Sequence, residues 1–181
     1  VGRIGEAGCG KTTTMKAIMR ILALNAIIAG GTITYRGSDV LRLGMRDMMR
    51  LRRTSMSMIF QDPTAALNPV FKVGEQLEDI VRYSEFTSNA PNKQGVITKA
   101  VALLKNAALP EPERILDSYP FQLSGGMRQR VCIAMSLASA KDLLIADEPG
   151  TSLDVTIEDQ IMRLLKQIVE DRGLSVILIS H

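Results

Sequence analysis

Apolar and polar positions along the chain follow two alternating patterns. Short apolar runs rich in valine and isoleucine predict buried parallel strands at residues 1–4, 57–60, 143–147 and 175–180. Elsewhere, apolar residues recur at helical spacing over residues 11–24, 74–83, 96–108, 126–139 and 156–172. Because strand-like and helical segments alternate, we expect an α/β fold with a parallel core sheet.

Two stretches differ from this alternation. At residues 31–35 apolar side chains alternate with threonine, which predicts a half-exposed strand in a small antiparallel β part. From residue 73 to residue 138 the pattern contains helices, loops and several prolines but no strand. We therefore expect a single domain over residues 1–181, with a helical subdomain at residues 73–138 inserted between two strands of the core sheet.

Composition and charge restrict the class of protein. A hydrophobic content of 46% in a chain of 181 residues suits one globular domain. The net charge of +3 is too small to favour a nucleic-acid partner, and we expect none. Arg42, Arg46 and Arg50 are four residues apart, which is typical of a solvated helix face rather than a binding patch.

The cysteines and the chain ends bear on location. Cys9 and Cys132 match neither a metal-ligand spacing nor a disulfide framework, which predicts a reducing compartment, the cytosol. The longest uncharged stretch, residues 21–35, is too short to span a bilayer, so we expect membrane contact only through a partner. Because the chain starts at Val1 and stops directly after an apolar run, we expect a fragment that lacks both ends.

A candidate phosphate-binding loop follows the first predicted strand. The sequence Gly5-Glu6-Ala7-Gly8-Cys9-Gly10-Lys11-Thr12 has the required glycines, lysine and hydroxyl. Glycines let backbone N–H groups point at phosphate oxygens, Lys11 supplies positive charge, and the Thr12 hydroxyl can bind Mg²⁺. An ordinary glycine-rich turn is the alternative, but a strand before the loop and a helix after it favour the phosphate site. The expected ATP contacts here are Gly5, Gly8, Cys9, Gly10, Lys11, Thr12 and Thr13.

Two carboxylates end the third predicted strand. Asp147 and Glu148 follow an apolar run, at the edge where open α/β sheets bind ligands. Consecutive strand residues face opposite ways, so we expect the two acids to act differently. Asp147 would hold Mg²⁺ through water or Thr12, and Glu148 would orient and deprotonate the attacking water. Acidic turn residues are common at strand ends, so this prediction depends on the phosphate loop.

A third candidate group is Leu123-Ser124-Gly125-Gly126-Met127-Arg128-Gln129-Arg130, which leads into a helical pattern. Ser124 is typical of a helix N-cap. Capping alone does not require two following glycines, whereas exposed N–H groups at a glycine-lined helix start suit a γ-phosphate. From these residues alone, a generic capped helix is the alternative.

This sequence, upstream of the acidic strand, resembles the signature of ABC ATPases, the motor subunits of ATP-driven transporters. Further matches follow in the expected order, with Gln61 after the second strand, Ser152-Leu153-Asp154 after the carboxylates and His181 after the last strand. The resemblance covers essentially the whole chain. It implies a P-loop NTPase fold of the ABC ATPase type and hydrolysis of ATP.

The resemblance also implies a dimer, homomeric or heteromeric, in which two motor domains pair head to tail. ATP at the phosphate loop of one domain would be capped by Ser124, Gly125 and Gly126 of the other. Gln61 would contact Mg²⁺ and the attacking water and sense the membrane partner. Asp154 would bridge the two sites, and His181 would contact the γ-phosphate. Because His181 is the only histidine, a bystander or core role is its alternative.

Several stretches are similar to the oligopeptide and dipeptide permease branch, to which nickel permeases also belong. They are Met58-Ile59-Phe60-Gln61-Asp62-Pro63, Leu67-Asn68-Pro69, Val73-Gly74-Glu75-Gln76, Tyr119-Pro120-Phe121-Gln122 and Asp154-Val155-Thr156. This similarity implies a peripheral protein at the cytoplasmic face of the cell membrane, with permease subunits and a solute-binding protein as partners. The cargo stays open between peptides, nickel and other solutes.

Some features depart from the family, and two other classes of protein stay open. Arg3 stands at an apolar strand position, Gly150 replaces a threonine near Asp154, and the aromatic residue that stacks on adenine would precede Val1. A non-transport ABC ATPase acting on DNA or ribosomes usually carries coiled-coil inserts or tandem motors, which this sequence lacks. A non-catalytic module is the other alternative, and the presence of Glu148 and His181 argues against a degenerate subunit.

Overall fold

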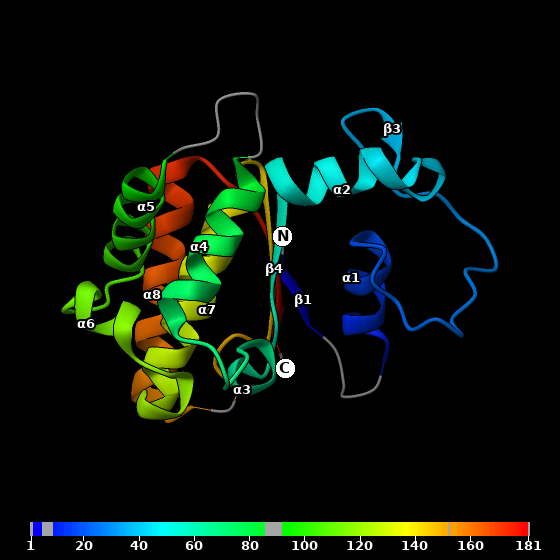
Figure 1. Ribbon diagram of the computed structural model, residues 1–181. Helices are drawn as coiled ribbons and strands as arrows, with labels where there is room; N and C mark the ends of the chain where they lie inside the picture. The colour runs from blue at the N-terminus through cyan, green and yellow to red at the C-terminus, as the bar shows by residue number, and fades with distance from the viewer. Residues whose placement is uncertain (1, 5–8, 86–91, 152, 181) are drawn as a thin grey trace.

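The computed structural model describes residues 2–4, 9–85, 92–151 and 153–180. Within these ranges the chain forms a parallel sheet and a small antiparallel hairpin, surrounded by helices (Figure 1). The parallel sheet has the strand order β1-β6-β5-β4. Its strands are β1 (Gly2–Ile4), β4 (Met56–Ile59), β5 (Leu143–Asp147) and β6 (Ser175–Ser180). The predicted α/β fold with a parallel core sheet is confirmed.

The helices lie on both sides of the sheet. In Figure 1, α4, α5, α7 and α8 lie on one side and α1 lies on the other. The helices are α1 (Lys11–Ile18), α2 (Met45–Thr54), α3 (Pro63–Ala66), α4 (Val73–Ser84), α5 (Lys93–Asn106), α6 (Pro112–Asp117), α7 (Gly125–Ser139) and α8 (Val155–Arg172), with short 3-10 turns η1 (Val40–Arg42) and η2 (Pro120–Gln122). Arg42, Arg46 and Arg50 are exposed as expected, but they do not share one helix face, because Arg42 ends η1 and only Arg46 and Arg50 belong to α2. No helix of the described ranges has both the length and the apolar character that a membrane crossing requires.

Strand β5 is central, because it pairs in parallel with β4 on one side and β6 on the other. Alternation of its side chains divides the core into two clusters. Leu144 and Ala146 join the larger cluster with α4, α5, α7 and α8, whereas Ile145 joins the smaller cluster with Met15 of α1. All three β5 side chains are 0% exposed. The sheet is therefore covered on both faces, and the acidic residue of β5, Asp147, lies at the end of its strand.

Helix α1 is shorter than the helical pattern at residues 11–24 predicted, and that expectation was wrong beyond Ile18. The chain turns at Arg20, whose φ is +50°. The carbonyls of Met19 and Arg20 accept hydrogen bonds from the Arg52 guanidinium at 2.8 and 2.7 Å. A cation at a helix C-terminus satisfies the last carbonyls and interacts favourably with the helix dipole. Arg52, which is distant in sequence, therefore stabilises the end of α1.

The antiparallel part is a hairpin of β2 (Thr34–Tyr35) and β3 (Ser38–Asp39). Its turn has positive φ at Arg36 and Gly37, which is the backbone of a tight hairpin turn. Tyr35 and Arg36 donate hydrogen bonds to the Asp142 carboxylate at 2.9 and 2.7 Å. These contacts attach the hairpin to the start of β5. An antiparallel part was predicted, but only the last two residues of the expected strand at 31–35 belong to it.

Between β4 and β5 the described part of the chain contains helices and no strand. Helix α7 contacts β4 as well as α4 and α5, so the helices and the sheet are continuous in packing. Whether residues 73–138 form a subdomain stays a prediction.

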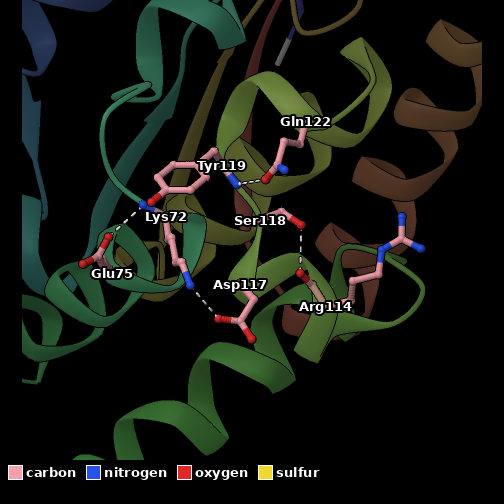
Figure 2. Close-up of polar contacts among 7 residues, drawn as sticks. All are labelled: Lys72, Glu75, Arg114, Asp117, Ser118, Tyr119 and Gln122. Atoms are coloured by element: carbon pink, nitrogen blue, oxygen red, sulfur yellow. Dashed lines mark hydrogen bonds and ion pairs between the residues drawn. The ribbon is translucent and has the colours of Figure 1, made fainter.

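The start of α4 lies against the segment that leads from α6 toward α7, as Figure 2 shows. The Val73 N–H donates to the Ser118 carbonyl at 2.9 Å, and Lys72 forms a 3.0 Å ion pair with Asp117. Gly74 is buried, and a Cβ added there would lie 2.8 Å from the Leu116 carbonyl oxygen. Only glycine allows the two backbones to approach this closely.

Substituting Gly74 with alanine should destabilise the fold by about 1–3 kcal/mol, because the added methyl group would push two backbone segments apart. The free energy of unfolding from urea titration measures the effect. Gly30→Ala is the matched control, since a Cβ at Gly30 meets no atom within 4 Å. Equal stability of the two variants would contradict the close contact at α4.

Candidate functional site

The carboxyl end of β5 and the amino end of α1 meet at one edge of the sheet. The Thr12 hydroxyl donates a 3.0 Å hydrogen bond to the Asp147 carboxylate, although the residues are 135 positions apart. Gly10 precedes α1 with a φ of +87°, a conformation that favours glycine. Gly5 and Gly8 lie outside the described residues, so their predicted phosphate contacts stay predictions. Thr12 and Asp147, which the sequence predicted to act on the same Mg²⁺, thus lie in contact.

Lys11 is the first residue of α1 and is mostly buried, with 9% exposure. Its Nζ atom lies 4.0 Å from the Cys9 sulfur, and Cys9 itself is exposed. The first N–H groups of a helix and the positive end of its dipole attract anions, and the ammonium of Lys11 adds positive charge at the same end of α1. This position therefore suits a phosphate group.

Asp147 is buried with 3% exposure, and its surroundings affect its charge. Burial raises the pKa of its carboxyl above the ordinary value, and the nearby Glu148 raises it further, while the hydrogen bond from Thr12 lowers it. A divalent cation bound beside Asp147 would favour the ionised form of its carboxyl. One carboxylate and one hydroxyl also fit Mg²⁺, which takes few protein ligands and keeps several waters. In the described ranges, no three or more His, Cys, Asp or Glu side chains form a larger metal site.

Glu148 follows β5 with a φ of +46°, a strained conformation for a residue other than glycine. Its backbone N–H donates to the Ile179 carbonyl at 3.1 Å, which holds it at the end of β6. Its side chain, with 8% exposure, accepts hydrogen bonds on Oε2 from Gln61 at 2.8 Å and Thr151 at 3.3 Å. Strain of this kind persists where the surrounding structure enforces it and is concentrated at functional sites.

The two adjacent acids therefore have different partners, as their alternation on a strand predicts. Asp147 contacts Thr12, whereas Glu148 contacts Gln61. Thr151 was not predicted as a site residue. The only sequence signal for it is a hydroxyl three residues after a strand-end carboxylate, which is too common to identify a site.

Ser124 caps helix α7, as its sequence predicted. Its hydroxyl oxygen accepts a hydrogen bond from the Met127 N–H at 3.3 Å, and its side chain is exposed. Gly125 and Gly126 form the first turn of α7. Because α7 and α1 lie on opposite sides of the sheet in Figure 1, the helix that Ser124 caps lies apart from the helix that begins with Lys11 and Thr12.

The other predicted site residues lie near the same edge or outside the described residues. Asp154 is exposed and precedes α8, and its carbonyl accepts the Glu158 N–H at 2.8 Å. Gly150 is buried, and its carbonyl accepts the Leu153 N–H at 2.9 Å, so the backbone near Asp154 is held in a turn. The residues outside the described ranges are Ser152 and His181, and the side chain of Arg3 is likewise not described.

Comparisons with known proteins agree with this geometry. The ABC transporter family model matches residues 1–151. The chain is 44% identical over 180 residues to the dipeptide transport ATP-binding protein DppD of Bacillus subtilis, covering 98% of this chain and 52% of DppD. It is 42% identical over 181 residues to the oligopeptide transport ATP-binding protein OppD of Salmonella typhimurium, covering 100% of this chain and 52% of OppD. The chain thus spans about half the length of these relatives.

A solved structure with a similar fold is a dimeric ATP-binding cassette in a post-hydrolysis state, bound to ADP and Pi. The TM-score is 0.81 at 28% sequence identity, and the match covers 99% of this chain and 73% of the other. The similarity therefore extends over the strands and helices that carry Thr12, Asp147, Glu148 and Ser124.

Replacing Asp147 with asparagine should raise the melting temperature of the protein without nucleotide. Because burial raises the pKa of Asp147, the folded state disfavours the ionised carboxylate, so this group lowers stability above its raised pKa. Asparagine is neutral and keeps an oxygen that can accept the Thr12 hydrogen bond. Thermal unfolding at a series of pH values measures the effect. The gain should shrink as the pH falls through the raised pKa, and an unchanged or lower melting temperature at neutral pH would contradict it.

Proposed function

Because the chain belongs to the ABC transporter family, we propose that it is the ATP-hydrolysing motor of a transporter that takes up peptides or a related small solute. One observation carries the proposal. The pairs Thr12–Asp147 and Gln61–Glu148 meet at the carboxyl edge of the central strand, next to the buried cation of Lys11. A hydroxyl, two acids, an amide and a lysine in this arrangement suit hydrolysis of a nucleoside triphosphate.

Nucleotide binding would use the loop before α1 and the first turn of that helix. Backbone N–H groups at the helix start and the Lys11 ammonium would bind the phosphates of ATP. Thr12 and Asp147 would hold Mg²⁺, since both oxygens are already within hydrogen-bond distance of each other. Bound there, Mg²⁺ would neutralise charge on the phosphate oxygens.

Hydrolysis would use Glu148 as the general base. The oxygen of water attacks the γ-phosphorus while the Glu148 carboxylate accepts its proton, and the bond from that phosphorus to the oxygen of ADP breaks. Gln61 and Thr151 both donate to Oε2 of Glu148, so they fix the orientation of the base. If Gln61 moved away, Oε2 of Glu148 would lose its hydrogen bond from Gln61 and keep the one from Thr151.

A second ATPase subunit, identical or homologous, would complete the site. Helix α7, which Ser124 caps, lies on the opposite side of the sheet from α1, so Ser124 would cap nucleotide bound to its own chain only after a large rearrangement. Head-to-tail pairing would place it over the nucleotide of the second subunit, with Asp154 between the two sites. The dimeric state of the structural neighbour supports this pairing.

Membrane permease subunits would contact a cavity beside Gln61. The cavity has a volume of about 260 Å³ and is mostly apolar. Its lining includes Phe60 of the segment before Gln61, Ile80 and Tyr83 of α4, and Met135 of α7. Phe60 and Tyr83 are 38% and 43% exposed, so an apolar segment of a partner can reach them. Because Phe60 adjoins Gln61, occupancy of the cavity would be transmitted to Glu148.

The cargo and location follow from the relatives by analogy. DppD and OppD are named as dipeptide and oligopeptide transport ATP-binding proteins, which supports peptide uptake. We place the protein at the cytoplasmic face of the membrane, attached through its permease subunits, with a solute-binding protein delivering the cargo.

ATP binding tests the proposal directly. Titration calorimetry of the intact protein with Mg²⁺ and ATP should show binding, and Lys11→Ala should remove it. Glu148→Gln should still bind ATP but should lower hydrolysis by about 100-fold or more, as expected for loss of a general base. This variant should accumulate as an ATP-bound dimer in size-exclusion chromatography. Hydrolysis at the wild-type rate would rule out Glu148 as the base.

The cavity predicts a separate class of variant. Ile80→Glu places a charge on the lining, so it should weaken association with the permease subunits by about tenfold or more, while ATP binding is retained. Ile97→Glu is the matched control, since Ile97 is also half-buried but lines a different hollow with α6. Co-purification with the permease subunits measures association. Equal losses in both variants would show that the effect is not specific to the cavity.

A further inference from the structure

Three glycines, two in the first turn of α7 and one in the turn after Glu148, pack against Leu153 and the first turn of helix α8. A Cβ added at Gly125 would lie 3.2 Å from Leu153 Cδ2, and one at Gly126 would lie 2.9 Å from Ile157 Cγ2. A Cβ at Gly150 would lie 2.5 Å from Glu158 Cγ. Real Cβ atoms rarely approach other heavy atoms so closely, so the space beside each glycine is already filled.

We propose that Leu153, Ile157 and Glu158, here called the α8 start, join the signature and the turn after Glu148 into one unit. This inference rests on the proposed function, because it concerns the signature and the turn after Glu148, the two segments that would meet the second subunit. The three residues are positioning residues, and none of them is proposed to touch the nucleotide.

The α8 start contacts both the first turn of α7 and the turn at Gly150. Leu153 lies two residues before α8 and faces Gly125, whereas Ile157 lies in the first turn of α8 and faces Gly126. Glu158 is the next residue, about 100° further around the helix, and it faces Gly150. Backbone hydrogen bonds from Leu153 to Gly150 and from Glu158 to Asp154, at 2.9 and 2.8 Å, fix this short turn.

The close packing leaves no room for the first turn of α7 to move without the turn at Gly150. Protein interiors transmit displacement when atoms are in contact without gaps. A shift of α7 would press on Ile157, and the same helix turn would displace Glu158 against Gly150. Gly150 is two residues after Glu148, and Asp154 lies in the same turn. The signature and Asp154 would therefore reach the second subunit together.

The glycines of the signature thus have a role within their own chain. Sequence reasoning explained them by the approach of a phosphate to backbone N–H groups. The contacts with Leu153 and Ile157 show that a side chain at either position would also collide with α8. Gly150, which replaces a threonine of the family pattern, forms a matched pair with Glu158 in this chain.

A double-mutant cycle on Gly150 and Glu158 tests the unit. In the intact protein carrying Glu148→Gln, Gly150→Ala should weaken ATP-dependent dimerisation by about tenfold, because the new methyl group collides with Glu158. The affinity of the monomer for Mg²⁺ and ATP should stay within about twofold. Adding Glu158→Ala removes the colliding Cγ and should restore dimerisation to within about threefold. Gly30→Ala, with no atom within 4 Å of its added Cβ, should change neither quantity.

The outcomes separate this inference from the proposed function. Wild-type dimerisation in Gly150→Ala, or no recovery in the double variant, would overturn the α8-start proposal alone. If no Mg²⁺ and ATP bind to the wild-type protein, the proposed function fails as well. If Gly150→Ala does not fold, Ile157→Ala tests the same unit through the contact with Gly126. It should weaken dimerisation and leave nucleotide affinity unchanged, and normal dimerisation would overturn the proposal.

Discussion

The hydrogen bond from Thr12 to Asp147 connects the start of α1 with the end of β5, the two segments that a nucleotide site requires. It can form because β5 lies between β4 and β6 in a parallel sheet, so that its carboxyl end reaches the start of α1. Ligand sites of open α/β sheets occur at this edge for the same reason. The order of strands in the sheet also sets the positions of Glu148 and Gln61. Glu148 directly follows β5, and Gln61 comes two residues after the end of β4.

Burial of charge at this edge is a cost that the rest of the fold must offset. Lys11, Asp147 and Glu148 are exposed by 9%, 3% and 8%, and Glu148 also has a positive φ. The apolar clusters on both faces of β5 supply the compensating stability. A site that is unfavourable without its ligand is typical of catalytic centres, where strain and buried charge are retained for function.

Close backbone approaches at glycine connect the helices to this edge. Gly74 brings α4 against the segment after α6, and Gly126 brings α7 against α8. Both glycines lie along the chain between Gln61 and Asp154. Helix α7 lines the cavity before Gln61 through Met135 and packs against α8 at Gly126.

Sequence by itself determined the core strands and the polar residue types that follow them. The apolar run at residues 143–147 predicted β5 with its observed bounds, because a strand buried on both faces is continuously apolar. The phosphate loop, the two acids and the Ser124 cap were also predicted, since each depends on residue type at short spacing.

Tertiary structure alone decided which side chains meet. Gln61 and Thr151 both donate hydrogen bonds to Glu148, and Arg52 donates to the end of α1. No sequence motif joins the residues of these contacts. Strand β3 escaped prediction because two residues are too few to show a periodicity. Local patterns report the burial and backbone preference of one segment, whereas the space that Glu158 occupies beside Gly150 depends on how a helix packs against a turn.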